Sequence, residues 1–277
     1  MTADGSIRVA ALSTTPVKGL RIAMPRGVEL ERSGAHGDRR FYLIDDRGRM
    51  INGKHSGALS EIAAALDDNE RLTLTFADGA RVSAATELGE RVETRFFSDP
   101  RTARLVRGPF SAALSEHAGE PLRLVCAADG ASAIDRGADG AVSLISSASL
   151  RRLAEVAGEP RVDARRFRMT IEVEGVEPFA EDQWLGEAVR VGDAVIVPRG
   201  HVGRCIVTSR DPESGRVDLP TLDLLRSFRD GLDTTEPLAF GVYGEVLQPG
   251  AIALGDRVEL DIDGSRLQPR VSTDRDE

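Results

Sequence analysis

Short segments in which apolar and polar residues alternate recur along the chain, and this pattern predicts many β-strands. The clearest is "RLTLTFADGARVSA" (71–84), where Leu72, Leu74 and Phe76 alternate with other residues before the turn dipeptide Asp78-Gly79, which predicts a hairpin. Further strands are predicted within the segments 7–12, 39–53, 167–175, 188–198, 204–210 and 256–262. The chain is therefore expected to be rich in strands.

Four segments instead repeat apolar residues every three or four positions, which predicts helices within 56–68, 110–121, 146–160 and 220–231. Ser111 and Thr221 are candidate N-caps, and serines also open the third segment. The helices do not alternate regularly with the strands, and the chain has no GxGxxG or P-loop motif. The pattern predicts a strand-rich α+β fold with antiparallel or mixed sheets closed into barrels.

Composition narrows the class of protein. The net charge of −9 argues against a general nucleic-acid or anionic-membrane surface, and no apolar run approaches the roughly 20 residues that cross a bilayer. The N-terminus lacks the pattern of a secretory signal, so we expect a cytoplasmic protein without nucleic-acid or membrane partners. The two cysteines, Cys126 and Cys205, cannot form a disulfide framework, and the four histidines lack zinc-site spacing.

Cys205 is the first candidate for chemistry. A free cysteine is commonly a buried apolar residue, which is the expectation for Cys126 in "LRLVCAA". Cys205 differs because Arg204 precedes it and favours the thiolate, while Gly203 leaves space for a ligand near the backbone. From the residues alone, Cys205 could be a buried core residue, a nucleophile or a ligand.

Basic residues form the second candidate feature. They occur in three distant clusters: Lys18 and Arg21, Arg39 and Arg40, and Arg165, Arg166 and Arg168. A single arginine is usually a surface residue, but these clusters adjoin glycines or predicted strands in an acidic protein. Because the guanidinium fork suits phosphate and carboxylate, we expect a small anionic ligand beside Cys205.

Six segments then carry a resemblance: "PVKGL" (16–20), "GDRRFYLIDDRG" (37–48), "LISSASLRRL" (144–153), "RRFRMTIEVEG" (165–175), "GRCIVTSRDPESG" (203–215) and "FGVYGEVLQPGAIALGD" (240–256). In this order they resemble the two-domain MOSC family, which includes the mitochondrial amidoxime-reducing component and its bacterial relatives. The resemblance implies an N-terminal β-barrel-like domain at 5–127 and a MOSC β-barrel domain with peripheral helices at 128–264. A disordered tail is expected at 265–277.

The resemblance also implies a molybdenum cofactor, Mo-molybdopterin, with Cys205 as the protein ligand of the metal. The implied cofactor contacts are Lys18, Gly19, Arg39, Asp139, Gly140, Arg168, Gly203, Arg204 and Tyr243. Asp211, a few residues beyond Cys205, is the candidate proton donor. The implied activity is reduction of hydroxylamines, amidoximes or N-hydroxylated bases, with electrons from a separate ferredoxin, flavoprotein or cytochrome.

Three alternatives stay open at this point. The protein could carry the cofactor without turnover, could transfer sulfur through a Cys205 persulfide, or could be a metal-free descendant with other chemistry. Gly19 stands where relatives often have serine, Gly203 stands where some relatives have serine, and Met169-Thr170 replaces the usual Pro-Asn.

Overall fold

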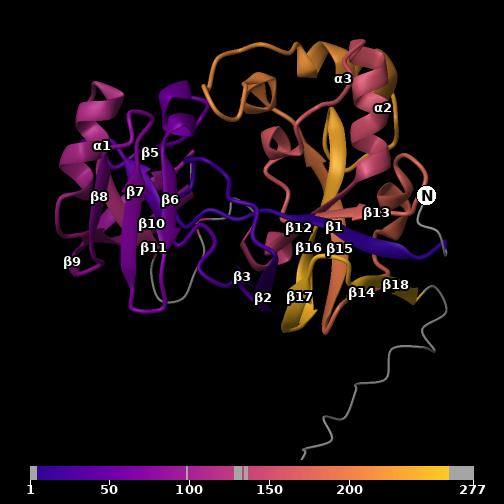
Figure 1. Cartoon of the computed structure of the whole chain (residues 1–277), viewed down its shortest axis with the longest axis horizontal. Helices are drawn as coiled ribbons and strands as arrows, with labels where there is room; N and C mark the ends of the chain where they lie inside the picture. Colours follow the sequence, from indigo (N-terminus) through magenta and orange to yellow (C-terminus); the bar gives the residue numbers. More distant parts are fainter. Residues whose placement is uncertain (1–4, 98, 128–132, 134–136, 262–277) are drawn as a thin grey trace, which may run out of the picture.

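The computed structural model describes residues 5–97, 99–127, 133 and 137–261, which form two lobes lying side by side (Figure 1). The lobe coloured indigo to magenta holds α1 and the strands around it, and the other lobe holds α2, α3 and the strands beneath them. The expected tail at 265–277 lies outside the described residues, as do several residues just after the predicted domain boundary at 127/128.

Seven strands close into a barrel in the order β1-β13-β12-β16-β15-β14-β18. They are β1 (Ile7–Leu12), β12 (Val142–Ser146), β13 (Ile171–Glu174), β14 (Ala188–Val191), β15 (Ala194–Gly203), β16 (Ala239–Gln248) and β18 (Arg257–Asp261). Only β12 and β13 run parallel, and the other neighbours in the barrel are antiparallel. The strand-rich α+β fold with a closed barrel is therefore confirmed.

The strand β1 lies near the start of the sequence, whereas the other six strands of the barrel all lie beyond residue 141. Leu12 pairs with Ile171 of β13, and Ile7 pairs with Val258 of β18. The barrel thus takes strands from both sides of residue 128, where the sequence predicts a domain boundary. That boundary stays a prediction.

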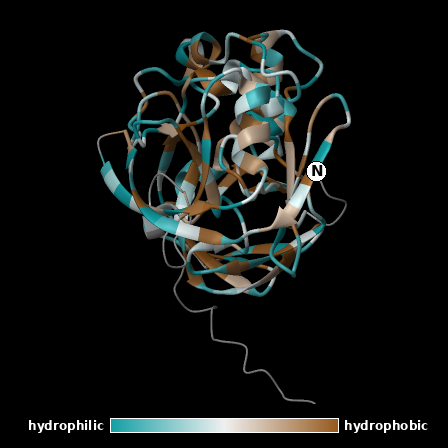
Figure 2. Ribbon diagram, turned by 90° about the vertical axis from the view of Figure 1, so that its left-hand side faces the viewer, coloured by the Kyte–Doolittle hydropathy of each residue, from teal (hydrophilic) through white to brown (hydrophobic). Residues whose placement is uncertain are grey.

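The other lobe contains two sheets. The five-stranded sheet has the order β5-β4-β11-β10-β9 and the three-stranded sheet the order β6-β7-β8. Their strands are β4 (Phe41–Ile44), β5 (Met50–Ile51), β6 (Ala63–Leu66), β7 (Arg71–Thr75), β8 (Arg81–Ala85), β9 (Leu88–Phe96), β10 (Asp99–Val106) and β11 (Arg123–Ala127). In Figure 2, which looks onto this lobe, hydrophobic residues lie along the inner strands and hydrophilic residues gather in the outer loops.

The core of this lobe joins the two sheets to α1 (Phe110–Ala118). Phe110 and Leu114 of the helix are fully buried in one cluster with Leu72 and Leu74 of β7. Cys126 lies in the same cluster at 5% exposure, and burial raises the pKa of its thiol, so its predicted place in the core is confirmed. Removing such apolar side chains from water is the main stabilising contribution.

A small sheet, β17-β2-β3, pairs β17 (Gly250–Ala253) with β2 (Gly27–Glu31), which pairs with β3 (Gly34–Ala35). The remaining α-helices are α2 (Ser147–Ala157) and α3 (Thr221–Arg229). The short 3₁₀ helices are η1 (Gly57–Glu61), η2 (Gly137–Gly140), η3 (Ala164–Phe167), η4 (Ala180–Trp184) and η5 (Ile206–Ser209). None of the described helices is long and apolar enough to cross a membrane.

Helices α2 and α3 form where the sequence predicts them. Ser146 caps α2, since its side chain accepts a hydrogen bond from the backbone N–H of Ser149, and Gly158 ends the helix in the left-handed conformation. Leu153 of α2 and Leu225 of α3 are fully buried in one cluster with Phe240 of β16. This cluster attaches both helices to β16, the barrel strand that pairs with β15.

Three predictions about the helices are wrong. The segment 56–68 is not a helix but the short η1 followed by β6, because Ala63–Leu66 pairs in register with β7. Ser111 does not cap α1, since its hydroxyl accepts the backbone N–H of Leu124 and the helix begins after Pro109. Thr221 is already inside α3, and its hydroxyl donates to the carbonyl of Thr208.

Candidate functional site

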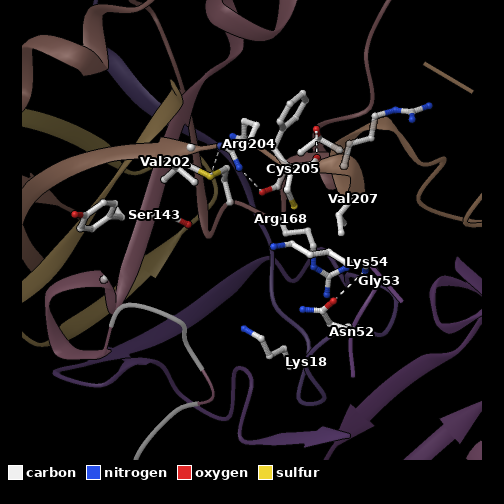
Figure 3. Close-up of a pocket in the computed structure, with 18 of the residues that line it drawn as sticks. Lys18, Asn52, Gly53, Lys54, Ser143, Arg168, Val202, Arg204, Cys205 and Val207 are labelled. Carbon is white, nitrogen blue, oxygen red and sulfur yellow. Dashed lines mark hydrogen bonds between the residues drawn. The ribbon is translucent and has the colours of Figure 1, made fainter. Parts of the chain in front are cut away.

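A cavity of about 570 Å³ lies where the two lobes meet, and residues of both lobes line it (Figure 3). Lys18, Asn52 and Lys54 come from the N-terminal part of the chain, whereas Arg168 and Cys205 come from the part that forms most of the barrel. Figure 3 shows Cys205 between Arg204 on one side and Arg168, Asn52 and Lys18 on the other. The structure therefore brings together residues that are far apart in the sequence.

Cys205 stands at the start of η5, directly beyond the end of β15, and it is half-buried and free of any disulfide. The predicted strand at 204–210 is wrong. Gly203 forms the last pair of β15 with Ala239, where β16 begins, so the chain beyond it has no strand to pair with. The carbonyl of Cys205 instead accepts two hydrogen bonds from Thr208, one from the backbone N–H at 3.0 Å and one from the side-chain hydroxyl at 2.9 Å. These bonds close the 3₁₀ turn.

Arg204 lines the cavity but directs its guanidinium to the protein backbone. Its Nε donates to the carbonyl of Phe240 at 2.9 Å, and Nη1 donates to the carbonyl of Phe167 at 3.0 Å. The guanidinium carbon lies 5.2 Å from the centre of the Phe167 ring. Arg204 thus joins β16 and η3 to the end of β15, and this fixes the backbone on one side of Cys205.

Arg39 and Arg168 form a pair of cations on the other side of the cavity. Both have left-handed backbones, with φ of 49° and 55°. Nη2 of Arg39 donates to the carbonyl of Arg168 at 2.8 Å, and Nη1 donates to the carboxylate of Asp38 at 2.8 Å. One N–H of Arg168 donates to the carbonyl of Leu20 at 2.8 Å. These bonds hold Arg39 and Arg168, which belong to separate lobes, close together.

The environment of Arg168 favours a bound anion. Burial lowers the pKa of its guanidinium to about 10, and the charge of Arg39 acts in the same direction, whereas Asp38 opposes it. An anion between these two guanidinium groups would offset their repulsion and would replace the lost hydration. The expected convergence of Arg39 and Arg168 is therefore seen in the structure.

Lys18 and Gly19 approach the cavity from the N-terminal lobe. Lys18 is only 8% exposed, and its ammonium donates to the carbonyl of Ala133 at 2.8 Å. Gly19 has φ of +94°, and a Cβ there would lie 3.3 Å from Cα of Asn52. A glycine suits this backbone conformation and this close contact.

The other predicted site residues divide into two groups. Gly140, Gly203 and Tyr243 line the cavity, but Asp139 is exposed and Asp211 lies away from it. Burial alone would raise the pKa of Asp211, but hydrogen bonds from Ser214 and Glu213 and the charge of Arg166 hold it below its usual value. Asp211 is therefore an ionised turn residue, and the structure does not bring it or Asp139 to the cavity lining.

Sequence reasoning missed several lining residues, among them Asn52, Lys54, Ser143, Val207 and Glu236. Asn52 lies within the predicted strand segment 39–53, and Val207 lies two residues beyond Cys205, so both had a positional signal. No positional signal marks Glu236, which precedes β16 by three residues, because only the fold places its loop against Gly203.

Comparisons with known proteins agree with this arrangement. A model of the MOSC N-terminal beta barrel domain matches residues 6–116, and a model of the MOSC domain matches residues 128–259. The mitochondrial amidoxime-reducing component 1 of Xenopus laevis is 25% identical, over 90% of this chain and 81% of its own length. The human component 1 is 34% identical, over 42% of this chain and 36% of its own length.

Among solved structures, the YUAD protein from Bacillus subtilis aligns over 92% of this chain and 95% of its own, with 12% identity and a TM-score of 0.43. The two domain models match in succession and together account for the lobe with α1 and for the barrel that carries Cys205. The chain belongs to the family of proteins that join a MOSC N-terminal β-barrel domain to a MOSC domain.

Proposed function

We propose that this protein binds a molybdenum cofactor in the cavity between its lobes and reduces N-hydroxylated compounds with electrons from a separate protein. The observation that carries the proposal is the convergence of one half-buried thiol, Cys205, with the cations Lys18, Arg39 and Arg168 around a single cavity. The names of the Xenopus laevis and human relatives, amidoxime-reducing components, support the same class of reaction.

The side chains around the cavity suit such a cofactor, a phosphorylated pterin dithiolene that brings most of its own ligands to the metal. A thiolate is a soft ligand that suits molybdenum, and Cys205 would offer its sulfur just beyond the end of β15. Arg39 and Arg168 suit the phosphate, because a guanidinium has five N–H donors and the bond to Leu20 uses one of those of Arg168. Lys18 would add a third positive charge from the other lobe.

The reaction requires two electrons and two protons for each substrate molecule. The N–O bond of R–NH–OH breaks, one proton goes to the nitrogen to give R–NH₂, and the other goes to the hydroxyl oxygen, which leaves as water. When bound, the cofactor would supply the redox chemistry that this reaction needs. A separate redox protein, such as a ferredoxin, flavoprotein or cytochrome, would deliver the electrons.

The chain's own residues position the reactants and shape the cavity. Cys205 would hold the metal, and the bonds from Arg204 to the carbonyls of Phe240 and Phe167 limit movement of the backbone beside it. Val202 and Met169, both buried, add apolar surface to the lining and reduce its hydration. Hydrogen bonds that hold a ligand's neighbours in place commonly tune the metal it binds.

The test is the molybdenum content of protein made in a host that accumulates the cofactor, measured by elemental analysis. We expect near-stoichiometric molybdenum in the wild type and in Cys126→Ala, the matched variant of the other cysteine. Cys205→Ala should lose the metal or the absorption that arises from the thiolate–metal bond. The loaded wild type should then reduce a hydroxylamine when a chemical reductant supplies electrons.

Other outcomes distinguish the alternatives. Molybdenum without turnover, together with release of the cofactor to an apoenzyme, would favour a carrier. A wild type without molybdenum would contradict the proposal, and mass analysis for a persulfide on Cys205 would then test sulfur transfer. Neither metal nor persulfide would favour unrelated chemistry.

A further inference from the structure

A second, much smaller cavity adjoins the candidate site, and Ser60, Arg166 and Arg168 line both cavities. The volume of the small cavity is about 10 Å³, which is room for one water molecule or one monatomic ion. The charged residues in its described lining are Arg165, Arg166, Arg168, Arg210 and Asp211. Four arginines and one aspartate therefore surround the place of a single small ligand.

Ion pairs balance most of the charge around the small cavity. Both carboxylate oxygens of Asp218 accept hydrogen bonds from Arg166, each at 2.6 Å. The other pairs are Arg165 with Asp163, Arg21 with Glu213 and Arg39 with Asp38. Each pair joins one positive charge to one negative charge, so together they leave no excess.

Arg168 and Arg210 have no carboxylate partner in the described part of the chain. Each donates instead to a backbone carbonyl, at 2.8 and 2.9 Å. Asp211 is the remaining charged residue of the described lining, and its carboxylate accepts the backbone N–H of Ser214 at 2.7 Å and the hydroxyl of Ser214 at 2.8 Å. Two positive charges and one negative charge leave an excess of one positive charge at the small cavity.

Two hydrogen-bond donors of the same arginine cluster lack an acceptor. Nε of Arg166 and Nε of Arg210 are buried, and no described atom accepts their hydrogens. The side chain of Arg166 is only 9% exposed, and Asp218 already occupies its other two nitrogens. A buried donor without an acceptor destabilises the fold, and native proteins rarely leave one. Because both arginines line the small cavity, one acceptor bound there would serve both donors.

We propose that the small cavity binds one chloride ion, which accepts the Nε–H groups of Arg166 and Arg210 and offsets the excess positive charge beside Arg168. A water molecule would accept the same hydrogens, but it carries no charge to offset the repulsion between buried cations. A phosphate is too large for the small cavity.

The chloride would also act on the larger cavity without entering it. Burial and the charge of Arg39 lower the pKa of Arg168, and an anion beside its guanidinium favours the charged form. Ile22 and Ser60 line the small cavity from the N-terminal part of the chain, whereas Arg210 follows η5. The ion thus stabilises the contact between these segments and the position of Arg168.

The test is thermal unfolding in sodium methanesulfonate that is replaced stepwise by sodium chloride, so that the ionic strength stays constant. Once chloride exceeds its dissociation constant, each tenfold increase in its concentration should raise the unfolding midpoint by about 3 °C, because a ligand of the folded state stabilises it logarithmically. Arg210→Met, which removes one Nε–H and one charge, should lose this rise. Arg216→Met removes an exposed positive charge from the same loop and should keep it.

Crystals of the wild type grown in sodium bromide provide an independent measurement, since bromide scatters anomalously and water does not. A bromide peak in the small cavity together with the chloride-dependent midpoint is the expected result. The proposal is overturned by equal midpoints in the two salts, by a full rise in Arg210→Met, or by a cavity without anomalous signal. A bromide peak without a chloride-dependent midpoint would indicate an adventitious ion only and would overturn it as well. If Arg210→Met does not fold, the wild-type midpoint and the bromide peak decide.

Discussion

Replacing Gly215 with alanine should destabilise the contact between the two lobes just beyond the candidate site. Gly215 has φ of +65°, and a Cβ there would lie 1.9 Å from the carbonyl oxygen of Gly57 in η1. The atom that would have to move is backbone, so no side-chain rotation relieves the clash. The carbonyl of Gly215 also accepts Nη1 of Arg210 at 2.9 Å, which holds the loop in place.

Two costs contribute to the effect of Gly215→Ala. The left-handed conformation costs alanine about 1 kcal/mol relative to glycine. Forcing one extra carbon into a packed contact costs about 1–3 kcal/mol. The free energy of unfolding should therefore fall by about 2–4 kcal/mol, and the midpoint of thermal unfolding should fall by roughly 5–15 °C.

The assay is thermal unfolding followed by circular dichroism, with Gly231→Ala as the matched control. Gly231 has a similar φ of +74° but no atom within 4 Å of the position that its Cβ would take. The control should show the conformational cost alone, roughly a third of the full effect. Equal losses in the two variants would refute the reasoning, because they would mean that the close approach of Gly57 and Gly215 gives way without cost.

Two further predictions concern charged residues of η4, Glu181 and Asp182. Burial raises the pKa of Glu181, which is fully buried, so its contribution to stability is present at acidic pH and is lost as pH rises through the folded-state pKa. Thermal unfolding from about pH 5 to pH 8 should therefore show the wild type losing stability relative to Glu181→Gln. Parallel pH curves for the two proteins would contradict this. Arg229 is 5% exposed and pairs with the half-buried carboxylate of Asp182 at 2.7 Å, so Arg229→Met should cost about 3 kcal/mol in urea unfolding because that carboxylate loses its guanidinium partner. Adding Asp182→Asn to Arg229→Met should recover part of the lost free energy of unfolding. If the losses of the two single variants simply add in the double variant, the pair does not stabilise the fold.

The sequence predicted the class of fold because its strongest signals are local. Alternation around Leu72 and Leu74 specifies β7 without help from distant residues. Ser146 and Gly158 likewise mark the start and the end of α2. Residues 63–66 were wrongly predicted as helix because "AAAL" has no alternation, and only pairing with β7 makes it a strand. The end of β15 at Gly203 likewise depends on where β16 begins.

The candidate site was predicted in part, and the resemblance rather than the spacing of residues supplied the link between its segments. Lys18, Arg39, Arg168 and Cys205 do line one cavity. The direction of a side chain was not predictable: Arg204 adjoins Cys205 in sequence, yet it binds the carbonyls of Phe240 and Phe167. Glu236 was missed because its place beside Gly203 depends on a loop fixed by His201, which is distant in the sequence.

The placement of β1 in the barrel has a consequence for how the chain matures during synthesis. Ile7 of β1 leaves the ribosome about 250 residues before Val258, its partner in β18. At a translation rate of about 5–20 residues per second, the first strand waits roughly 12–50 s for that partner. During that interval the apolar side chains of Val9 and Leu12 lack the barrel that buries them, so a chaperone that shields nascent chains should raise the yield of folded protein.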